Sequence, residues 1–352
     1  MTETAIAHPV QAPGKMMWLG EYAVLDGAPA IVAAIDRHVR VTFEPGGSGL
    51  RLTSNLWDGE WTAQSGDDAL LPEPPAEAQR LVYAVVRTVA DALIDVRWQA
   101  GVLHIDSAEL SHESKLGLGS SGAVAAALTV ALAGRALPVD SRLLELALQA
   151  HHTFQGRAGS GSDVIASMLG GVVHCGGGRP PFRITEPVPS FVAFYAGHSA
   201  DTREMVRRIR QWQQGGGQAA TKLLARLRDI ATRGAFALRK DDRPGFIDAV
   251  ERFARAEREL TAASGVPIIC DSIDKIMEFC LANGYIAKPS GAGGGDVVVA
   301  FHLQPEVAYD PSAELHARGW LRDAARERPF EFLNLNVAID GALAALQRHD
   351  KT

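Results

Sequence analysis

Cysteine is scarce in this sequence, and long apolar runs are missing. The 352 residues include three cysteines, Cys175, Cys270 and Cys280. An odd number at wide spacing gives neither a disulfide framework nor a paired zinc motif, so we expect reduced thiols. The longest apolar run, 123–133, is too short to span a bilayer and contains Thr129. These absences predict a cytoplasmic protein that does not enter membranes.

A surplus of positive charge is also missing. Lys and Arg number 35 against 41 Asp and Glu, which gives a formal net charge of -6. This balance excludes bulk attraction to nucleic acid or to an anionic membrane, so an anionic ligand needs a locally cationic pocket. The N-terminal residues lack a basic region followed by an apolar stretch, and no signal peptide is expected. The remaining composition, 47% hydrophobic and 22% charged, is that of a globular chain long enough for one large domain or two smaller ones.

Apolar spacing predicts a mixture of strands and helices. The expected strands lie at 16–19, 30–44, 101–106, 285–288, 296–303 and 331–338. The expected helices lie at 76–93, from a turn at 117–122 to about 134, at 139–155, shortly after 162, and at 201–213, 218–240, 244–263, 270–283 and 309–326. Asp, Gly and Pro between 54 and 75 predict surface loops. We therefore expect an α+β fold of two lobes, divided near Pro187 to Pro189 into residues 1–188 and 189–352.

The first stretch with chemical content is A-P-G-K-M-M-W-L-G-E-Y-A-V-L-D-G, residues 12–27. Lys15 follows a Pro-Gly turn and leads into an apolar strand, where it can place a compact positive charge at the mouth of a cleft. Glu21 and Tyr22 come just after Gly20, where the strand should turn. By itself the stretch is more typical of a solvated lysine beside a turn.

The second stretch is K-L-G-L-G-S-S-G-A, residues 115–123. Its glycines let the backbone approach a ligand closely, and the helix that follows presents free N–H groups and the positive end of its dipole to an anion. Ser120 and Ser121 can add hydroxyl contacts or ligate a Mg²⁺ that bridges phosphates. It is not a Walker A loop, because no Lys-Ser/Thr pair closes it and Lys115 precedes it instead. The alternative is a glycine-rich turn with a serine N-cap.

The third stretch is H-H-T-F-Q-G-R-A-G-S-G-S-D-V-I-A-S, residues 151–167. Asp163 follows a Gly/Ser turn at an expected helix start, where its carboxylate can point into a pocket and orient an acceptor or help to hold a metal. Arg157 in the same loop offers a bidentate partner for a phosphate. The common alternative for such an aspartate is a helix N-cap.

The fourth stretch is A-K-P-S-G-A-G-G-G-D-V-V-V-A-F, residues 287–301. Four glycines within five positions, followed by a β-branched run, make a backbone concavity that can support phosphates or substrate. The alternative is a strained hairpin. Asp296, at the start of the strand, is expected to do no more than hydrogen-bond the glycine loop.

Taken in order, these motifs resemble those of the GHMP kinases, the family of galactokinase, homoserine kinase, mevalonate kinase and phosphomevalonate kinase. A-P-G-K…G-E-Y-A-V-L is similar to the first family motif, G-L-G-S-S-G to the phosphate-cradling second motif, and S-G-A-G-G-G-D to the C-terminal glycine motif. The matches span residues 12 to 301. The resemblance implies a GHMP-kinase-like two-lobed fold, with an N-terminal nucleotide-binding lobe and a C-terminal α/β lobe.

Within the family, the motifs are most similar to those of the phosphomevalonate kinases. The segments 115–122 and 287–296 resemble K-x-G-L-G-S-S-G and A-K-x-S-G-A-G-G-G-D of that group, and His151, Gln155 and Asp163 stand in register with A-H-x-x-x-Q-G-x-x-G-S-G-x-D-V. Mevalonate kinases typically carry a Glu on the helix before the Asp, where it helps to bind Mg²⁺. Two histidines occupy that region here, which argues against a mevalonate kinase and leaves the metal ligands beyond the serine loop open.

The resemblance implies transfer of the γ-phosphoryl group of ATP to the phosphate of mevalonate 5-phosphate, with ATP and Mg²⁺ as cofactors. The expected partners are this small phosphorylated substrate and, in a homodimer, a second copy of the chain; no nucleic acid or membrane partner is expected. A GHMP kinase with an alcohol acceptor, such as mevalonate or a sugar, is one alternative. A protein of this fold that binds ATP and a metabolite as a sensor, without catalysis, is another.

The site residues that the resemblance implies fall into three groups. The expected catalytic residues are Lys15, which offsets phosphate charge, and Asp163, which orients the acceptor. The expected ATP-binding residues are Lys115, Gly117, Leu118, Gly119, Ser120, Ser121 and Gly122, with Ser121 and then Ser120 as ligands of Mg²⁺. The expected substrate-binding residues are Glu21, Tyr22, Arg157, Ser160, Ser199, Thr202, Lys288, Ser290, Gly291, Ala292 and Gly293.

Overall fold

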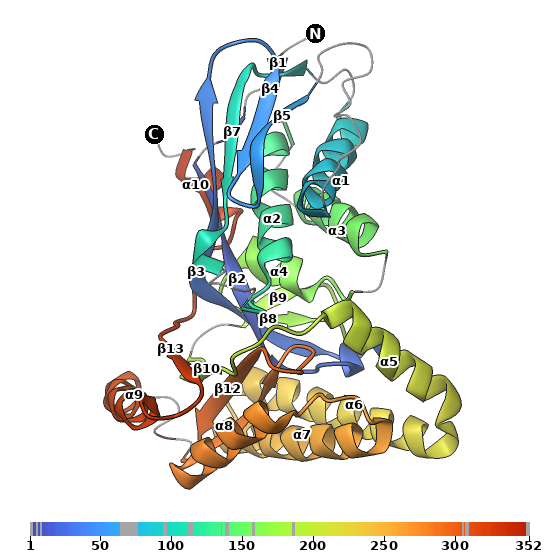
Figure 1. The fold of residues 1–352 in the computed structure, drawn as a ribbon, viewed down its shortest axis with the longest axis vertical. Coiled ribbons are helices and arrows are strands. Elements are labelled where there is room, and N and C mark those ends of the chain that lie inside the picture. Colours follow the sequence, from blue (N-terminus) through green and yellow to red (C-terminus); the bar gives the residue numbers. More distant parts are fainter. Residues whose placement is uncertain are drawn as a thin grey trace.

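The chain forms two lobes, each built on its own β-sheet and stacked along the long axis of the molecule (Figure 1). The computed structural model describes residues 3–4, 6–7, 9–63, 77–93, 97–110, 116–134, 136–137, 141–156, 159–184, 187–304, 306 and 310–349. None of the described helices is both long and apolar enough to cross a membrane.

The first lobe is organised around one long central strand. Its seven-stranded sheet runs in the order β5-β4-β7-β3-β8-β9, and β2 pairs with the other edge of β3. The strands are β2 (Val10–Leu19), β3 (Ala30–Pro45), β4 (Leu50–Ser54), β5 (Trp57–Ala63), β7 (Gly101–Asp106), β8 (Val172–Cys175) and β9 (Phe182–Ile184). Because β3 has 16 residues, it pairs with β7 through 40–45 and with β8 through 30–33 on one edge. It also fixes β2, the strand that carries Lys15.

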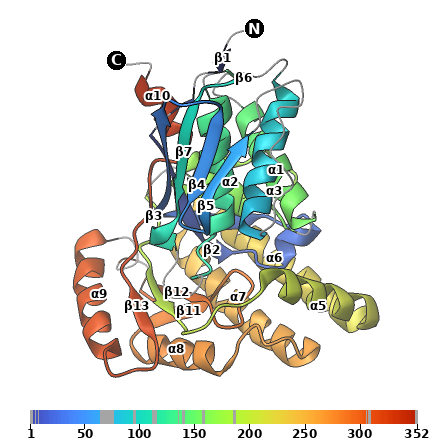
Figure 2. The ribbon, with the colours of Figure 1, turned by 45° about the horizontal axis from the view of Figure 1, so that its top comes forward.

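Four helices lie against one side of this sheet (Figure 2). They are α1 (Glu77–Ala92), α2 (Ser120–Ala133), α3 (Ser141–Gln155) and α4 (Ser162–Leu169). Every residue of α2 from Gly122 to Ala133 is buried. A helix that is apolar on all sides belongs at the centre of a lobe, and this accounts for its alanine-rich sequence. The small elements are β1 (Glu3–Thr4), which pairs with β6 (Arg97–Trp98), and the 3₁₀ turns η1 (Ala23–Asp26) and η2 (Ala108–Leu110).

The second lobe places a four-stranded antiparallel sheet against long helices. The strand order is β11-β12-β10-β13, with β10 (Val192–Tyr195), β11 (Tyr285–Ser290), β12 (Val297–His302) and β13 (Glu331–Leu333). The helices are α5 (Thr202–Gly215), α6 (Gly217–Arg239), α7 (Arg243–Ser264), α8 (Asp271–Ala282) and α9 (Pro311–Ala325). The tight connection between β11 and β12 is the glycine-rich segment 291–295, so the sheet fixes both ends of this segment.

Two features join the lobes. The indole of Trp18, on β2, lies 5.6 Å from the ring of Phe191, 6.3 Å from Phe246 and 5.2 Å from Phe301. These three rings come from the second half of the chain, and all four are fully buried. The chain end then returns to the first lobe, where Val337 bridges Ile35 and the last helix, α10 (Ala344–His349), follows.

The spacing-based predictions of helices are confirmed, with ends that shift by a few residues. Residues 57–63, expected as a loop, form β5; that prediction was wrong, because pairing with β4 buries Trp61 and outweighs the local Asp and Gly. Residues 64–75 lie outside the described part. The expected strand at 331–338 ends at Leu333. Strands β8, β9 and β10 were not predicted, since three or four residues show no usable period.

The division into two domains stays a prediction. The sheet of the first lobe ends with Ile184 and that of the second begins with Val192, so the change of sheet falls around Pro187 to Pro189. The returning chain end, however, gives the first lobe residues from beyond position 335.

Candidate active site

The ammonium of Lys15 lies between two glycine loops. We define the first glycine loop as residues 116–119 and the second as residues 291–295. Lys15 donates from its backbone N–H to Leu118 O (2.8 Å) and from Nζ to Gly117 O (3.3 Å). A Cβ on Gly291 would lie 3.5 Å from the same Nζ. The lysine that follows the Pro-Gly turn is therefore held by the backbone of one loop and reaches the other.

The first glycine loop delivers its backbone to the N-terminus of α2. Gly117 and Gly119 have φ angles of 72° and 79°, which side chains other than glycine rarely adopt. A Cβ on Gly119 would also lie 2.6 Å from Cγ of Lys15. Gly119 caps α2 without a side-chain hydrogen bond, so the N–H groups of the first turn have no capping side chain. This arrangement suits an anion such as a phosphate. Lys115 lies outside the described residues.

Asp163, on the first turn of α4, faces the start of α2. Asp163 Oδ1 accepts a hydrogen bond from the N–H of Val164 (2.9 Å), and Asp163 Oδ2 lies 3.5 Å from Nε2 of His151. A Cβ on Gly122 would lie 2.9 Å from Cγ of Asp163, so the glycine allows the two helices this close approach. Ser121 Oγ lies 3.2 Å from the same His151 nitrogen. The structure thus brings together Ser121 and Asp163, which lie on separate elements.

Two serines shape the turn before Asp163. Ser160 Oγ donates to Ser162 Oγ (2.9 Å) and accepts from Ser162 N–H (3.3 Å), which fixes the turn into α4. Arg157, an expected phosphate partner, lies outside the described residues.

Glu21 and Lys288, both expected near substrate, form a buried ion pair. Lys288 Nζ donates to Glu21 Oε1 (2.5 Å) and to Pro289 O, and Gly291 N–H donates to the same carboxylate oxygen (3.3 Å). Glu21 is 2% exposed and Lys288 is fully buried. The pair therefore ties the end of β2 to the second glycine loop, although 267 positions separate its members.

The neighbouring residues Tyr22, Ser290 and Ala292 also have protein partners. The Tyr22 hydroxyl donates to Ala292 O (2.5 Å), and Ser290 Oγ accepts from Met17 N–H (2.8 Å). Tyr22 adopts a φ of 58°, which is unusual for a residue with a Cβ. Burial, followed by the nearby Glu257 and Glu21 carboxylates, raises the pKa of Tyr22 above its usual range, so the hydroxyl stays a donor. Whether any of these residues also contacts a substrate stays a prediction.

Asp296 is a candidate site residue to which the sequence analysis gave no role beyond the glycine loop. Its Oδ1 accepts from Ala200 N–H (3.0 Å), and a Cβ on Gly117 would lie 2.8 Å from its Oδ2. Burial raises the pKa of Asp296 above its ordinary value, against the opposing effects of the Ala200 N–H, Lys15 and Ser199. The carboxylate thus links the two glycine loops to the segment that carries Ser199. Both Ser199 and Thr202 are exposed, and Thr202 opens α5 next to its cap Asp201.

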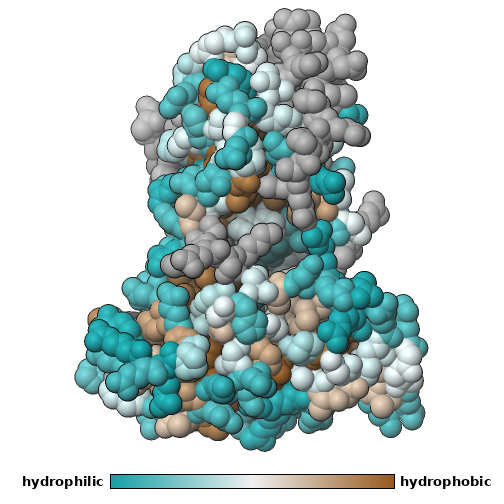
Figure 3. Space-filling model, in the orientation of Figure 1, coloured by the Kyte–Doolittle hydropathy of each residue, from teal (hydrophilic) through white to brown (hydrophobic). Residues whose placement is uncertain are grey.

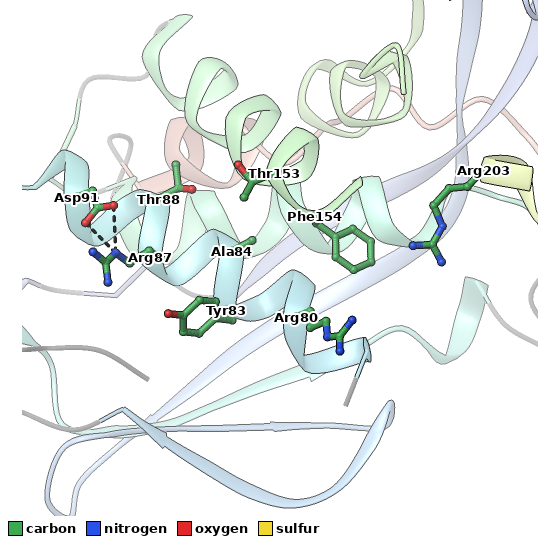
Figure 4. A pocket seen from close by; sticks show the side chains of 9 residues that line it. All are labelled: Arg80, Tyr83, Ala84, Arg87, Thr88, Asp91, Thr153, Phe154 and Arg203. Atoms are coloured by element: carbon green, nitrogen blue, oxygen red, sulfur yellow. Dashed lines mark hydrogen bonds and ion pairs between the residues drawn. The ribbon is translucent and has the colours of Figure 1, made fainter. Parts of the chain in front are cut away.

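A cavity of about 330 Å³ opens beside Thr153 and Phe154, on the helix that also carries His151 (Figure 4). Its walls come from α1, the last turn of α3 and the start of α5, and Arg80 and Arg203 lie on either side of Phe154. The lining residues are Arg80, Tyr83, Ala84, Arg87, Thr88, Asp91, Thr153, Phe154 and Arg203. Lys15 and Asp163 do not line it. The face of the molecule in Figure 3 is largely hydrophilic over both lobes, with apolar residues visible between them.

The donors around the first glycine loop suit a hard cation. Mg²⁺ prefers oxygen ligands and usually keeps several waters beside one or two protein ligands. Ser121 supplies a hydroxyl oxygen and Asp163 a carboxylate oxygen, next to N–H groups that suit phosphate. Among the described residues, no group of three or more His, Cys, Asp or Glu side chains could hold a metal by itself. The site therefore fits a cation that is bound mainly through phosphate oxygens and water.

Family models of known proteins match parts of both halves of the chain. The family model for the GHMP kinases N terminal domain matches residues 80–171, and that for the GHMP kinases C terminal matches residues 237–318. The mevalonate kinase of Aeropyrum pernix is 30% identical over 302 residues, which cover 84% of this chain and 89% of that protein. The phosphomevalonate kinase of Streptomyces sp. (strain CL190) is 28% identical over 344 residues, which cover 85% of this chain and 90% of that protein.

Solved structures show the same fold. The phosphomevalonate kinase of Streptococcus pneumoniae, in complex with phosphomevalonate and AMPPNP, superposes with a TM-score of 0.74 at 20% identity and covers 94% of this chain and 99% of its own. The Lin0012 protein of Listeria innocua gives a TM-score of 0.78 at 21% identity, with coverage of 93% and 98%.

Proposed function

The chain belongs to the GHMP kinase family, and from this premise we propose that it transfers the γ-phosphoryl group of ATP to the phosphate of mevalonate 5-phosphate, giving mevalonate 5-diphosphate and ADP. One observation carries the proposal. Two glycine loops, each able to accept an anion, face one lysine ammonium: Lys15 Nζ is 3.3 Å from Gly117 O and 3.5 Å from the Cβ position of Gly291. A reaction between two phosphates needs this kind of charge neutralisation at the point where they meet.

In this proposal the triphosphate of ATP lies at the first glycine loop and the first turn of α2. The N–H groups after Gly119 and the positive end of the α2 dipole bind its oxygens. Ser121 and Asp163 are the residues that would hold Mg²⁺, with Ser120 as a further candidate. When bound, the ion supplies positive charge that offsets the charge of the transferring group.

Lys15 lowers the repulsion between the two anions, and Asp163 orients the acceptor. The acceptor phosphate has a second pKa of ~6, so it is largely ionised at neutral pH and does not need a strong general base. The carboxylate of Asp163 can therefore act through its position and its field. Catalysis of this kind consists mainly of placing the two groups in line and stabilising their charge.

The substrate side is proposed at the second glycine loop. Gly291, Ala292 and Gly293 present backbone to the ligand, and Ser199, Thr202, Ser160 and Arg157 are the proposed polar contacts. Glu21, Tyr22, Lys288 and Ser290 are proposed to hold this loop, because each of them already makes a hydrogen bond to the protein. Once activity is established, substitution of the proposed polar contacts tests the substrate side.

An alcohol acceptor is the second candidate. The 30% identity to the Aeropyrum mevalonate kinase favours it. In that case Asp163 would serve as the base that removes the hydroxyl proton. The residue beside Asp163 argues against it, since the described residues place an imidazole, His151, at the position where we expect a second carboxylate in a mevalonate kinase.

The test is ADP release by the purified protein with Mg-ATP and, in parallel, mevalonate 5-phosphate, mevalonate, homoserine or galactose. Turnover confined to mevalonate 5-phosphate is the expected result. Turnover with mevalonate or another alcohol would keep the family and overturn the proposed acceptor. Binding of ATP without turnover on any of the four would favour a sensor and count against the proposal.

A further inference from the structure

The imidazole of His151 lies between the first turn of α2 and the first turn of α4. His151 belongs to α3, and its side chain is fully buried. Its Nε2 lies 3.2 Å from Ser121 Oγ on α2, 3.5 Å from Asp163 Oδ2 on α4 and 3.3 Å from Gln155 Nε2 one helical turn along α3. Three helices thus meet at one nitrogen atom.

The other ring nitrogen has no such surroundings. Nδ1 of His151 is buried, and no hydrogen-bond partner for it occurs among the described residues. A buried polar atom without a partner destabilises the fold, so the contacts of the other ring nitrogen must offset this cost. All the described hydrogen-bonding of this side chain is concentrated at Nε2, the atom that faces Ser121 and Asp163.

We propose that His151 is a positioning residue that fixes Ser121 and Asp163 relative to each other. The inference rests on the proposed function for the roles of these two residues. The ring is fully buried and acts through them. Both contacts require Nε2 to carry the proton of the ring, as an N–H donor shared between Ser121 Oγ and Asp163 Oδ2. This hydrogen bond selects one of the three staggered positions of the serine side chain and leaves the hydroxyl hydrogen and the other lone pair of Oγ for the ligand side. The same N–H restrains the Asp163 carboxylate, whose Cγ lies 2.9 Å from the Cβ position of Gly122.

This arrangement predicts that the position of one nitrogen matters more than the presence of a ring. Gln can place its amide group near the position of Nε2, whereas the shorter Asn reaches only the position of Nδ1. We expect His151→Gln to retain most of the wild-type kcat. His151→Asn and His151→Leu should each lose roughly 10- to 100-fold in kcat, because small misplacements of reacting groups have effects of this size. The KM for the acceptor should change less than kcat, since the ring is fully buried and acts through Asp163.

The matched control is His174→Leu. His174 is also a buried histidine, 5% exposed, and it stacks on Phe182 at the edge of the same lobe. It reports the effect of losing a buried imidazole away from Ser121 and Asp163, and its kcat should equal that of the wild type. A loss of kcat in His174→Leu as large as that in His151→Leu would overturn the inference.

A binding measurement separates this inference from the proposed function. Titration calorimetry with Mg-AMPPNP should show several-fold weaker binding to His151→Asn than to His151→Gln, whatever the acceptor of the reaction is. Equal affinities and equal kcat values for the two amide variants would overturn the inference. If the wild type does not phosphorylate mevalonate 5-phosphate, the proposed function fails, and the nucleotide titration still tests the role of His151. The amide pair also keeps the test intact if His151→Leu does not fold.

Discussion

Lys15 brings a positive charge to the point where the two glycine loops come together. Replacement by Met keeps the length and much of the volume of the side chain and removes the charge. We expect Lys15→Met to lower kcat by roughly 100-fold or more, because a preorganised charge at the reacting group is lost.

Steady-state kinetics at saturating Mg-ATP and acceptor measure this effect. The control is Lys275→Met, which removes an exposed lysine on α8 and should leave kcat unchanged. Near-normal turnover in Lys15→Met would show that the lysine is not part of the chemistry.

Glu257 is a buried carboxyl group that the site does not use directly. It is fully buried on α7, with neither oxygen hydrogen-bonded among the described residues, and lies 4.0 Å from the Lys288 ammonium that already pairs with Glu21. Burial raises the pKa of Glu257 well above its ordinary value; Lys288 opposes this shift and the charge of Glu21 adds to it. Two carboxyl groups thus share one buried ammonium, and the neutral form of Glu257 is favoured.

This pKa predicts how stability depends on pH. In the folded chain Glu257 keeps its proton at pH values where the unfolded chain, with a pKa of about 4.3, has lost it. The folded state therefore binds more protons, and its stability falls as pH rises between the two pKa values. Glu257→Gln removes this dependence. The unfolding free energy of the variant minus that of the wild type should therefore increase with pH in that window, by up to about 1.4 kcal/mol per pH unit.

Urea unfolding of both proteins at several pH values from 5 to 8 measures this gain. A difference between the two that does not change with pH would mean that Glu257 is ionised in the folded protein.

At the scale of elements, the close approach of α2 to α4 should be very sensitive to a single substitution. Gly122 lies in the first turn of α2, and a Cβ there would come within 2.9 Å of the backbone and side chain of Asp163. Since backbone cannot move aside as a flexible side chain does, we expect Gly122→Ala to displace Asp163 and to lower kcat by roughly 100-fold.

Gly319→Ala is the matched control for this substitution. Gly319 lies on α9, and nothing lies within 4 Å of its Cβ position. Alanine there should raise the stability by about 1 kcal/mol through helix propensity and leave kcat unchanged. Thermal unfolding and kinetics of both variants check the pair; a fully active Gly122→Ala would show that the two helices can separate without loss.

Local sequence was sufficient for helices α1 to α9, for the longer strands and for the two glycine-rich segments, but not for strands β5, β8, β9 and β10. The helices follow from apolar spacing, and the GHMP-type fold expected from the motifs is confirmed by the family models and by the solved structures. The contacts among distant residues could not be predicted in this way. Nothing near Lys288 indicates that its partner is Glu21, and nothing near His151 indicates that its Nε2 faces Ser121. Such pairs depend on how helices and sheets pack, which periodicity does not specify.

At the scale of the whole molecule, we expect the aromatic cluster around Trp18 to make the two lobes unfold as one cooperative unit. The indole lies on β2 of the first lobe, and its three neighbours Phe191, Phe246 and Phe301 belong to the second half of the chain. Trp18→Ala should lower the unfolding free energy by about 3–5 kcal/mol, as large-to-small substitutions of buried aromatic residues do.

Differential scanning calorimetry distinguishes a shared core from two independent ones. The wild type should unfold in one transition, and Trp18→Ala should unfold at a lower temperature or in two steps. Two separate transitions in the wild type would mean that the lobes are independent and that the cluster does not couple them.

The returning chain end has a consequence for the order in which this protein can fold during synthesis. Ala338 N–H donates to Ala34 O on β3 (2.9 Å), Ala338 O accepts from Gly171 N–H (2.7 Å), and Ala342 N–H donates to Ser167 O (2.9 Å). Domains that emerge first from the ribosome generally fold first. Here the N-terminal lobe takes its last backbone partners from residues that are still inside the exit tunnel when the rest of the lobe is already outside. Its folding can therefore be completed only after residues 338–342 have left the tunnel, long after the rest of the lobe has emerged.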